Sequence, residues 1–346
     1  MKPTRVAIIG GGAAGFFAAI TCAEALGGRG EVTLLEATAH LLAKVKVSGG
    51  GRCNVTHACF DPAELVQRYP RGGRELLGAF HRFQPRDTIA WFAARGVATK
   101  TEEDGRMFPI TDDSATIAEC LLDAARRAGV GIRTQTAVRA VERTALGLKL
   151  TLSAGEPLLC DRIILATGGN KASGGLAIAE SLGHAIVPPV PSLFTFNIQD
   201  PRLADISGVS VENVEASLTG TKLRTQGPLL VTHWGLSGPA ILKLSAWGAR
   251  EFAERAYRCE VGVNWVPGSK REALLAQLTH LRQAEARKQI GTFSPVPLPQ
   301  RLWEKLVTAA GIATTTPWAH VTNPALQSLV GQLTDARFAV EGKSTF

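Results

Sequence analysis

Several features that would assign this chain to a special class of protein are missing or scarce. The 346 residues include only six cysteines, and none of them forms a CxxC pair, so neither a disulfide framework nor a cysteine-bound metal is indicated. No apolar run approaches the roughly 20 residues needed to cross a bilayer, and the N-terminus has no secretion-signal pattern. We therefore expect a cytoplasmic globular protein with reduced thiols, without a metal and without membrane association.

Charge of one sign is not concentrated anywhere along the chain. The formal net charge is +8, but the lysines and arginines alternate with acids and form no basic run. Such interleaving is typical of a solvated surface and disfavours a nucleic acid as partner. A small-molecule substrate and an anionic cofactor are compatible with it, and nothing in the sequence indicates an oligomeric state.

The N-terminal region has the pattern of a βαβ unit. Residues 5–9 (RVAII) predict a short buried strand, the alanine-rich residues 13–26 predict a helix, and residues 31–35 (EVTLL) predict a second strand. A strand, a helix and a strand within about 30 residues cross over in a right-handed sense and imply a parallel sheet. The fold class is therefore α/β of the Rossmann type.

Further elements follow at regular intervals. Residues 114–127 predict a helix, residues 131–134 a strand, residues 138–152 a hairpin that turns near 145–147, and residues 162–166 another buried strand. Three prolines within residues 186–191 then interrupt any continuing helix, and the sequence pattern changes after them. Short alternating runs follow as far as about residue 266, and residues 269–333 have a helical pattern. We place a domain boundary near Pro188.

The strongest motif is the GxGxxG formed by residues 10–15. Gly10 permits a tight turn after the strand, Gly12 lets the backbone approach a pyrophosphate, and Gly15 lets the helix pack closely on the sheet. The positive end of the helix dipole then faces the pyrophosphate. Glu36, at the end of the second strand, is expected to accept hydrogen bonds from both ribose hydroxyls, and its charge disfavours a 2′-phosphate. These residues indicate FAD or NAD rather than NADP.

Two observations favour FAD over NAD. Residues 162–169 (RIILATGG) run from a buried strand into small residues, Thr167 and Gly168 among them, as a chain does where it passes close to a dinucleotide. There is also no second GxGxxG that would form a separate NAD(P) domain. Residues 44–54 add a basic, glycine-rich loop, in which Lys44 and Arg52 can offer charge to a phosphate or to a reduced flavin.

Three segments carry a resemblance to a known family. Residues 48–54 (SGGGRCN), 105–109 (GRMFP) and 232–239 (THWGLSGP) resemble those of bacterial three-domain FAD flavoproteins, which include aminoacetone oxidases and flavin-dependent reductases of unsaturated bile-acid ketones. The resemblance implies an FAD-binding domain into which a β-barrel-like domain and a small helical domain are inserted. The expected domains are residues 1–187 for FAD binding, 188–267 for the β-rich insertion, 268–333 for its helical part and 334–346 for the start of the return to the FAD domain.

The motifs and the resemblance together give a set of expected FAD neighbours. These are Gly10, Gly12, Ala13, Ala14, Gly15, Glu36, Lys44, Ser48, Gly49, Gly50, Arg52, Cys53, Asn54, Val138, Thr167 and Gly168. Two departures from the family pattern concern this site. The segment after the ATGG motif is shortened to NKASGG, and the chain ends at Phe346, where such proteins continue into a segment that closes over the flavin. The sequence is therefore expected to be a fragment that binds FAD weakly.

Catalytic residues are not identified by the sequence, and two candidates are weak. Arg106 follows an acidic stretch, so a salt bridge to Glu102, Glu103 or Asp104 is an alternative to a catalytic role. His233 lies in a glycine-rich turn and could exchange a proton near the flavin, although a structural role is the alternative.

The expected function is that of an FAD-dependent oxidoreductase. Hydride would pass through flavin N5 between a nicotinamide cofactor, or a small organic substrate, and an acceptor. One alternative is a thiol–disulfide oxidoreductase that uses Cys53 and Cys59. Five residues separate these cysteines instead of the usual four, which on a helix turns Cys59 by about 100° away from Cys53. Another alternative is a non-catalytic flavin-binding or RNA-associated protein.

Overall fold

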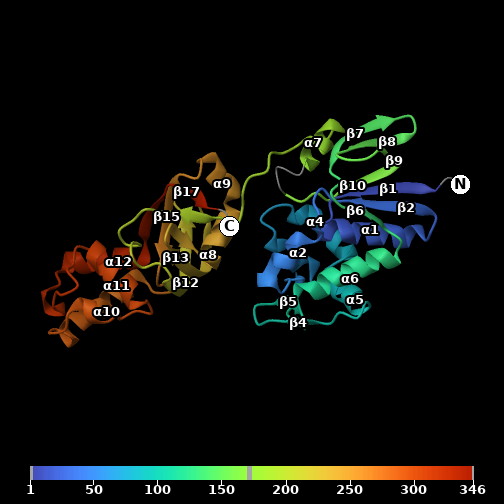
Figure 1. Cartoon of the computed structure of the whole chain (residues 1–346). Coiled ribbons are helices and arrows are strands. Elements are labelled where there is room, and N and C mark those ends of the chain that lie inside the picture. The colour runs from blue at the N-terminus through green and yellow to red at the C-terminus, as the bar shows by residue number, and fades with distance from the viewer. Residues whose placement is uncertain (1–2, 170–173, 345–346) are drawn as a thin grey trace. The chain divides into compact units, whose positions relative to one another are not determined.

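The computed structural model describes residues 3–169 and 174–344, and it divides the chain into two compact units (Figure 1). The first unit comprises residues 1–187 and the second comprises residues 188–346. The shortened NKAS part of the segment after the ATGG motif, residues 170–173, lies outside the described residues.

The first unit is built on the predicted βαβ unit. Strand β1 (Thr4–Ile9), helix α1 (Ala13–Leu26) and strand β2 (Gly30–Leu35) follow one another as the sequence indicates. Strands β6 (Gly131–Arg133) and β10 (Arg162–Leu165) complete a parallel sheet in the order β10-β1-β2-β6. The prediction of a Rossmann-type parallel sheet is confirmed.

Side-chain alternation along β1 explains why this sheet has a covering layer on each face. Val6 and Ile8 contribute to a core with α1 and with helix α6 (Ser114–Arg127). Ala7 and Ile9 point the other way, because successive strand residues face opposite sides, and they pack with the hairpin sheet. Figure 1 shows α1 and α6 on one side of the sheet and β7, β8 and β9 on the other. The bounds of that second layer are β7 (Val138–Thr144), β8 (Gly147–Leu152) and β9 (Leu158–Cys160).

The remaining elements of the first unit lie between β2 and α6, or follow β10. They are α2 (Ala43–Val47), a 3₁₀ turn (Ser48–Gly51), β3 (Thr56–His57), α3 (Pro62–Leu65), a second 3₁₀ turn (Val66–Arg68), α4 (Gly73–Arg82), α5 (Pro85–Ala93), β4 (Thr99–Thr101), β5 (Arg106–Pro109) and α7 (Gly175–Ser181). Strands β3, β5 and β4 form a small antiparallel sheet.

The second unit is organised around one seven-stranded antiparallel sheet. Its order is β16-β15-β12-β13-β14-β11-β17. The bounds are β11 (Thr195–Asn197), β12 (Ser210–Leu218), β13 (Arg224–Thr232), β14 (Gly235–Ser237), β15 (Cys259–Asn264), β16 (Ala336–Val340) and β17 (Gly342–Ser344). Strands β16 and β17 stand at opposite ends of this order although Glu341 alone separates them. Two residues of chain span at most about 7 Å, so the sheet must curl until its ends meet, and the barrel-like architecture is confirmed.

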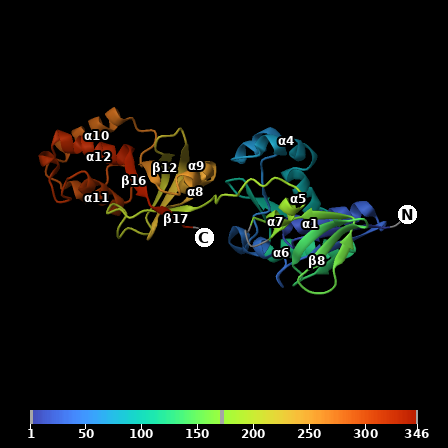
Figure 2. The same cartoon turned by 90° about the horizontal axis from the view of Figure 1, so that it is seen from above.

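Helices complete the second unit and share one apolar core with the sheet. They are α8 (Pro239–Trp247), α9 (Ala249–Glu254), α10 (Arg271–Ala284), α11 (Gln300–Ala309) and α12 (Asn323–Thr334), with 3₁₀ turns at Ile290–Thr292 and Trp318–His320. Helix α8 lies against β12 and β13, whereas α10, α11 and α12 gather at one end of the unit (Figure 2). The core runs without interruption from Phe194 through Leu278 and Trp303 to Phe338.

One detail of the second unit differs from the sequence-based expectation, and another concerns how its last helix begins. Residues 336–344 pair with β15 and β11, so as far as Ser344 the segment expected to begin a return to the FAD domain belongs to the barrel. The N-cap of α12 is Thr322, whose hydroxyl accepts a hydrogen bond from the Ala325 N–H at 3.3 Å. Asn323 is therefore the first helical residue, because the threonine one position earlier can already satisfy a free N–H of the first turn.

Candidate functional site

A cavity of about 1060 Å³ lies in the first unit at the carboxyl ends of the parallel strands. Each of the four strands leads into its wall: β1 through Gly10, β2 through Glu36, β6 through Thr136 and β10 through Ala166. In open α/β sheets this edge is where ligands bind. The volume is at the upper end of the range for small-molecule sites, which suits a ligand of dinucleotide size.

The first glycine loop is shaped by close contacts between backbone segments. A Cβ on Gly15 would stand 1.8 Å from the Gly10 carbonyl oxygen, and a Cβ on Gly10 would stand 2.4 Å from the Ala166 carbonyl oxygen. Gly10 also has a φ of +117°, which side chains rarely adopt. By contrast, a Cβ on Gly12 would meet no atom within 4 Å. The structure therefore packs Gly10 and Gly15 against protein and leaves space in front of Gly12.

Helix α1 presents a free N-terminus to this space. Its N-cap is Gly12, which provides no side-chain cap, and the first turn contains no acidic residue. The N–H groups of the first turn have no intrahelical acceptor, and the helix dipole adds partial positive charge there. Ala13 and Ala14 line the cavity at this point. The arrangement is suited to an anionic group such as a pyrophosphate.

Glu36 is held in place by three donors. The Gly11 N–H donates to its Oε2 at 2.7 Å, while the Thr38 N–H and hydroxyl both donate to Oε1 at 2.9 Å. A carboxylate offers about four acceptor positions, so one remains, on Oε2. Glu36 thus links the first glycine loop to the end of β2 and keeps an acceptor position for one ribose hydroxyl. A second hydroxyl would have to share an acceptor with Thr38.

Lys44 supplies positive charge to the cavity wall. It lies on α2, close to Gly168, which follows β10. If Gly168 had a Cβ, that atom would stand 3.8 Å from the Lys44 Nζ. Among the described residues no carboxylate is within ion-pair distance of Lys44. Its ammonium group is therefore available to a negatively charged part of a ligand.

The second glycine loop, residues 48–53, contributes one face to the cavity. Ser48, Cys53 and the adjoining Asn54 line the cavity, and the Cys53 N–H donates to the Ser48 carbonyl oxygen at 3.0 Å. Cys53 has a φ of +61°, although it is not a glycine. Burial raises the pKa of the Cys53 thiol, and the Ser48 side chain opposes this shift only in part. A thiol held in its protonated form is a poor nucleophile.

The structure brings most of the expected FAD neighbours together in this one cavity. The expected residues that line it are Gly10, Gly12, Ala13, Ala14, Glu36, Lys44, Ser48, Cys53, Asn54, Val138, Thr167 and Gly168. Four expected neighbours do not line it: Gly15, Gly49, Gly50 and Arg52. Gly15 packs against Gly10, as described above, and Arg52 points to the small β3-β5-β4 sheet.

The two candidate catalytic residues lie in different units of the chain. Arg106 begins β5 and makes ion pairs with Asp104 at 2.6 Å and Glu102 at 3.2 Å, which is the salt-bridge alternative. The Arg106 side chain does not line the cavity of its own unit. His233 lies in the second unit, in the turn between β13 and β14, where its ring makes an edge contact with Trp234, with 4.4 Å between the ring centres.

Sequence reasoning missed two groups of cavity residues. Thr38 and Thr136 flank Glu36, and the Thr136 N–H donates to the Glu36 carbonyl oxygen at 2.8 Å. Their positions just after β2 and β6 are the signal that could have identified them. The second group is apolar, and Phe17, Phe92 and Ile117 are examples from three different helices. They are separated by 100 residues of sequence, and no local pattern connects them.

Cys59 does not share the position of Cys53. Both thiols are free and buried, but only Cys53 lines the cavity. Cys59 follows β3, and its N–H donates to the His57 carbonyl oxygen at 2.8 Å. The chain between them contains β3 and no helix, so the rotation expected for a helix with this spacing does not apply.

Within residues 3–169 and 174–344, no group of three or more His, Cys, Asp or Glu side chains could hold a metal ion. Across the same residues, no helix has the length and apolar character that a bilayer span requires.

The fold and the cavity together define a Rossmann-type protein that binds a dinucleotide. The open space before Gly12, the free N-terminus of α1, the anchored Glu36 and the cationic Lys44 all fit FAD. Residues 4–316 match the family model described as the HI0933-like protein Rossmann domain. The chain belongs to this HI0933-like family of FAD-binding proteins, and the family resemblance expected from its sequence is confirmed.

Named relatives cover most of the chain. It is 30% identical over 311 residues to the 3-dehydro-bile acid delta(4,6)-reductase of Clostridium scindens, covering 87% of this chain and 75% of that protein. It is 32% identical over 310 residues to the ribosomal RNA dihydrouridine synthase of Escherichia coli, covering 86% and 72%. Among solved structures, Thermovibrio ammonificans THI4 superposes with a TM-score of 0.36 at 17% identity, over 55% of this chain and 66% of that one, a level that adds nothing to the assignment.

Proposed function

We propose that this chain is an FAD-dependent reductase that saturates a carbon–carbon double bond next to a carbonyl group. The observation that carries the proposal is the single cavity formed by the first glycine loop, Glu36, Lys44 and the second glycine loop. Bound FAD would supply hydride transfer at its N5 atom, with a nicotinamide cofactor or a small organic substrate as the source of the hydride.

The residues of the chain have separate tasks in this proposal. The first-turn N–H groups of α1 bind the pyrophosphate, and Glu36 binds the adenosine ribose through the free acceptor position on Oε2. Lys44 offsets negative charge on the cofactor. Ser48, on the second glycine loop, and Asn54, which follows the loop, border another part of the cavity. They position the part of the cofactor that is bound there.

The names of the relatives support the choice of substrate class. One relative is named as a reductase of an unsaturated 3-dehydro bile acid, and another as a synthase of dihydrouridine in ribosomal RNA. Both names describe the addition of hydrogen to a double bond conjugated with a ring carbonyl, although one substrate is a steroid and the other is RNA. The shared chemistry is therefore proposed here, and the particular substrate is not.

A thiol–disulfide exchange function is less well supported. It requires a second thiol beside Cys53 at the cavity, whereas Cys59 is not a lining residue, and burial raises the pKa of the Cys53 thiol. A role in RNA modification is favoured by the relative from Escherichia coli, and it falls within the same chemistry.

One sample tests the proposal in two stages. A visible absorption spectrum of the purified protein supplemented with FAD, repeated after NADH or NADPH is added under nitrogen, reports cofactor binding and the electron donor. The reduced protein is then mixed with a conjugated ring enone, the corresponding isolated alkene and an aromatic disulfide. Reoxidation by the enone alone is the expected result. Reoxidation by the disulfide alone would establish thiol chemistry instead.

A further inference from the structure

The second glycine loop, residues 48–53, has two faces with different surroundings. Ser48 and Cys53 face the cavity, as described above. On the other side, a Cβ on Gly49 would stand 2.7 Å from the ring of Phe108, a buried residue of β5. The guanidinium of Arg52 lies over the same ring, 4.0 Å from its centre. The loop is therefore attached to β5 on the side away from the cavity.

The backbone of this loop is closed by its own hydrogen bond from the Cys53 N–H to the Ser48 carbonyl oxygen, but its conformation is costly. Gly49, Gly50, Gly51 and Cys53 all have positive φ values, between +58° and +87°. A chain with three successive glycines loses much conformational entropy when it becomes ordered, and a non-glycine residue at positive φ adds strain. Contacts from outside the loop therefore help to hold it in place.

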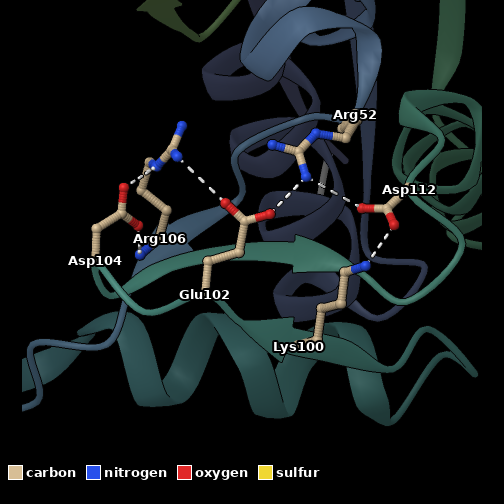
Figure 3. A network of polar contacts seen from close by, with 6 residues as sticks. All are labelled: Arg52, Lys100, Glu102, Asp104, Arg106 and Asp112. Atoms are coloured by element: carbon tan, nitrogen blue, oxygen red, sulfur yellow. Dashed lines mark hydrogen bonds and ion pairs between the residues drawn. The ribbon is translucent and has the colours of Figure 1, made fainter.

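Arg52 provides the strongest of these contacts. Its Nη1 lies 2.5 Å from Glu102 Oε1 and 3.5 Å from Asp112 Oδ1, and these acids come from the two ends of the β4–β5 hairpin. Figure 3 shows the Glu102 carboxylate between the guanidinium groups of Arg52 and Arg106, with Lys100 on the far side of Asp112. The hydrogen bond from Lys100 lowers the pKa of Asp112, which keeps that carboxylate charged at neutral pH. The guanidinium of Arg52 thus lies between the carboxylates of Glu102 and Asp112 and contacts both.

We infer that Arg52 is a positioning residue that clamps the second glycine loop to the β4–β5 hairpin, with Glu102 as its principal partner, and so preorganises the cavity wall for the cofactor. The inference rests on the proposed binding of FAD in this cavity. It also assigns to Arg52 a role different from the direct cofactor contact that its sequence context suggests. Because Nη1 of Arg52 already contacts Glu102 and Asp112, the cation acts on FAD through the loop.

A double-mutant cycle distinguishes a clamp from a direct contact. The variants are Arg52→Gln, Glu102→Gln and the double variant, with Glu103→Gln as the matched control. Glu103 lies in the same turn and is exposed, and among the described residues it has no ion pair. Thermal unfolding is recorded for each variant, and FAD dissociation constants are measured by equilibrium titration.

For a clamp, Arg52→Gln raises the FAD dissociation constant roughly fivefold to tenfold, because an ion pair and a cation–π contact are lost. Glu102→Gln raises it by about twofold to fivefold, because the ion pair alone is lost. The double variant is no weaker than the worse single variant, because both remove the same contact. Glu103→Gln matches the parent. If Arg52 contacted FAD directly, Glu102→Gln would bind FAD as tightly as the parent or more tightly, and this result would overturn the inference.

Hydrogen exchange of the FAD-free protein provides a readout that does not depend on the cofactor. The amides of residues 49–54 should lose protection in Arg52→Gln and in Glu102→Gln, but not in Glu103→Gln. Unchanged protection in both single variants would refute the clamp even if the parent binds FAD. Failure of the parent to bind FAD, with protection lost as expected, would instead count against the proposed function alone.

Discussion

Residues 10–15 and residues 48–53 are both glycine-rich and both border the cofactor cavity, but they are held in place differently. In the first loop, backbone atoms touch backbone atoms, with Gly15 against Gly10 and Gly10 against Ala166. In the second loop, Cβ positions on Gly50 and Gly51 would meet no atom within 4 Å, and the long side chain of Arg52 makes the attachment. Gly10 and Gly15 of the first loop are required because space is lacking, whereas Gly50 and Gly51 of the second loop are required by their backbone angles.

The sharpest test of this difference lies within the first loop. Gly15→Ala should lower the free energy of unfolding of the first unit by about 3 kcal/mol or more, since a methyl group cannot share space with the Gly10 carbonyl. Gly12→Ala should change the stability of the FAD-free protein by less than about 0.5 kcal/mol, yet weaken FAD binding at least about tenfold, because the methyl group enters the space where the backbone approaches the pyrophosphate.

Urea unfolding of the FAD-free variants and FAD titration measure the two effects separately. Equal destabilisation by Gly12→Ala and Gly15→Ala would contradict the steric account of the first loop.

Glu36 extends the comparison to the residue that ties the first loop to β2. Glu36→Ala should weaken FAD binding by roughly 1.5–3 kcal/mol, because a ribose hydroxyl loses a charged acceptor. Glu31→Ala, on the same strand but at its exposed start, is the control and should leave binding unchanged. An Ala variant at position 36 that keeps the affinity of the parent in an equilibrium titration would show that this acid does not contact the cofactor.

At Gly51 the second loop should respond to backbone angles and not to bulk. At Gly51 the φ is +87° and the space is open, so Gly51→Ala should cost about 1 kcal/mol of strain and raise the FAD dissociation constant up to about fivefold. Gly51→Asn should stay closer to the parent, because asparagine tolerates this region better. FAD titration of both variants checks the order, and a larger loss for Asn than for Ala would mean that bulk matters here too.

The smallest effect is expected at Cys59, which follows β3. Cys59→Ser should leave the rate of flavin reduction by a nicotinamide donor unchanged within about twofold, because Cys59 lies away from the cavity and the Cys53 thiol remains protonated. Stopped-flow absorbance under nitrogen measures the rate. Loss of turnover, together with loss of a charge-transfer band, would promote the dithiol mechanism.

The parts of the fold that could be predicted from sequence are those that local pattern controls. The βαβ unit, the helix at 114–127 and the hairpin at 138–152 appear within one residue of the expected positions, because hydrophobic period, capping and turn residues act over short distances. The spacing from Gly10 to Glu36 likewise reflects one βαβ unit. The ion pairs of Arg106 with Asp104 and Glu102 could also be anticipated from the sequence, as an alternative to a catalytic role for Arg106. The reason is that all three residues lie within a segment of five.

The parts that could not be predicted depend on residues brought together from afar. Arg52 meets Glu102 and Asp112 across 50 and 60 residues, and no local signal reveals that its charge is already satisfied. The place of residues 336–344 in the barrel also depends on pairing with strands as distant as β11, 149 residues away at Thr195 and Ser344.

The meeting of β16 and β17 has a consequence for colloidal behaviour. Unpaired strand edges can recruit the strands of other molecules and so template aggregation. In the second unit both terminal strands are short, and the Glu341 corner brings these two terminal strands close together. Disrupting that corner would expose the edges of β11 and β15 at the same time, so a change there would first be seen as self-association and not as loss of the cofactor site.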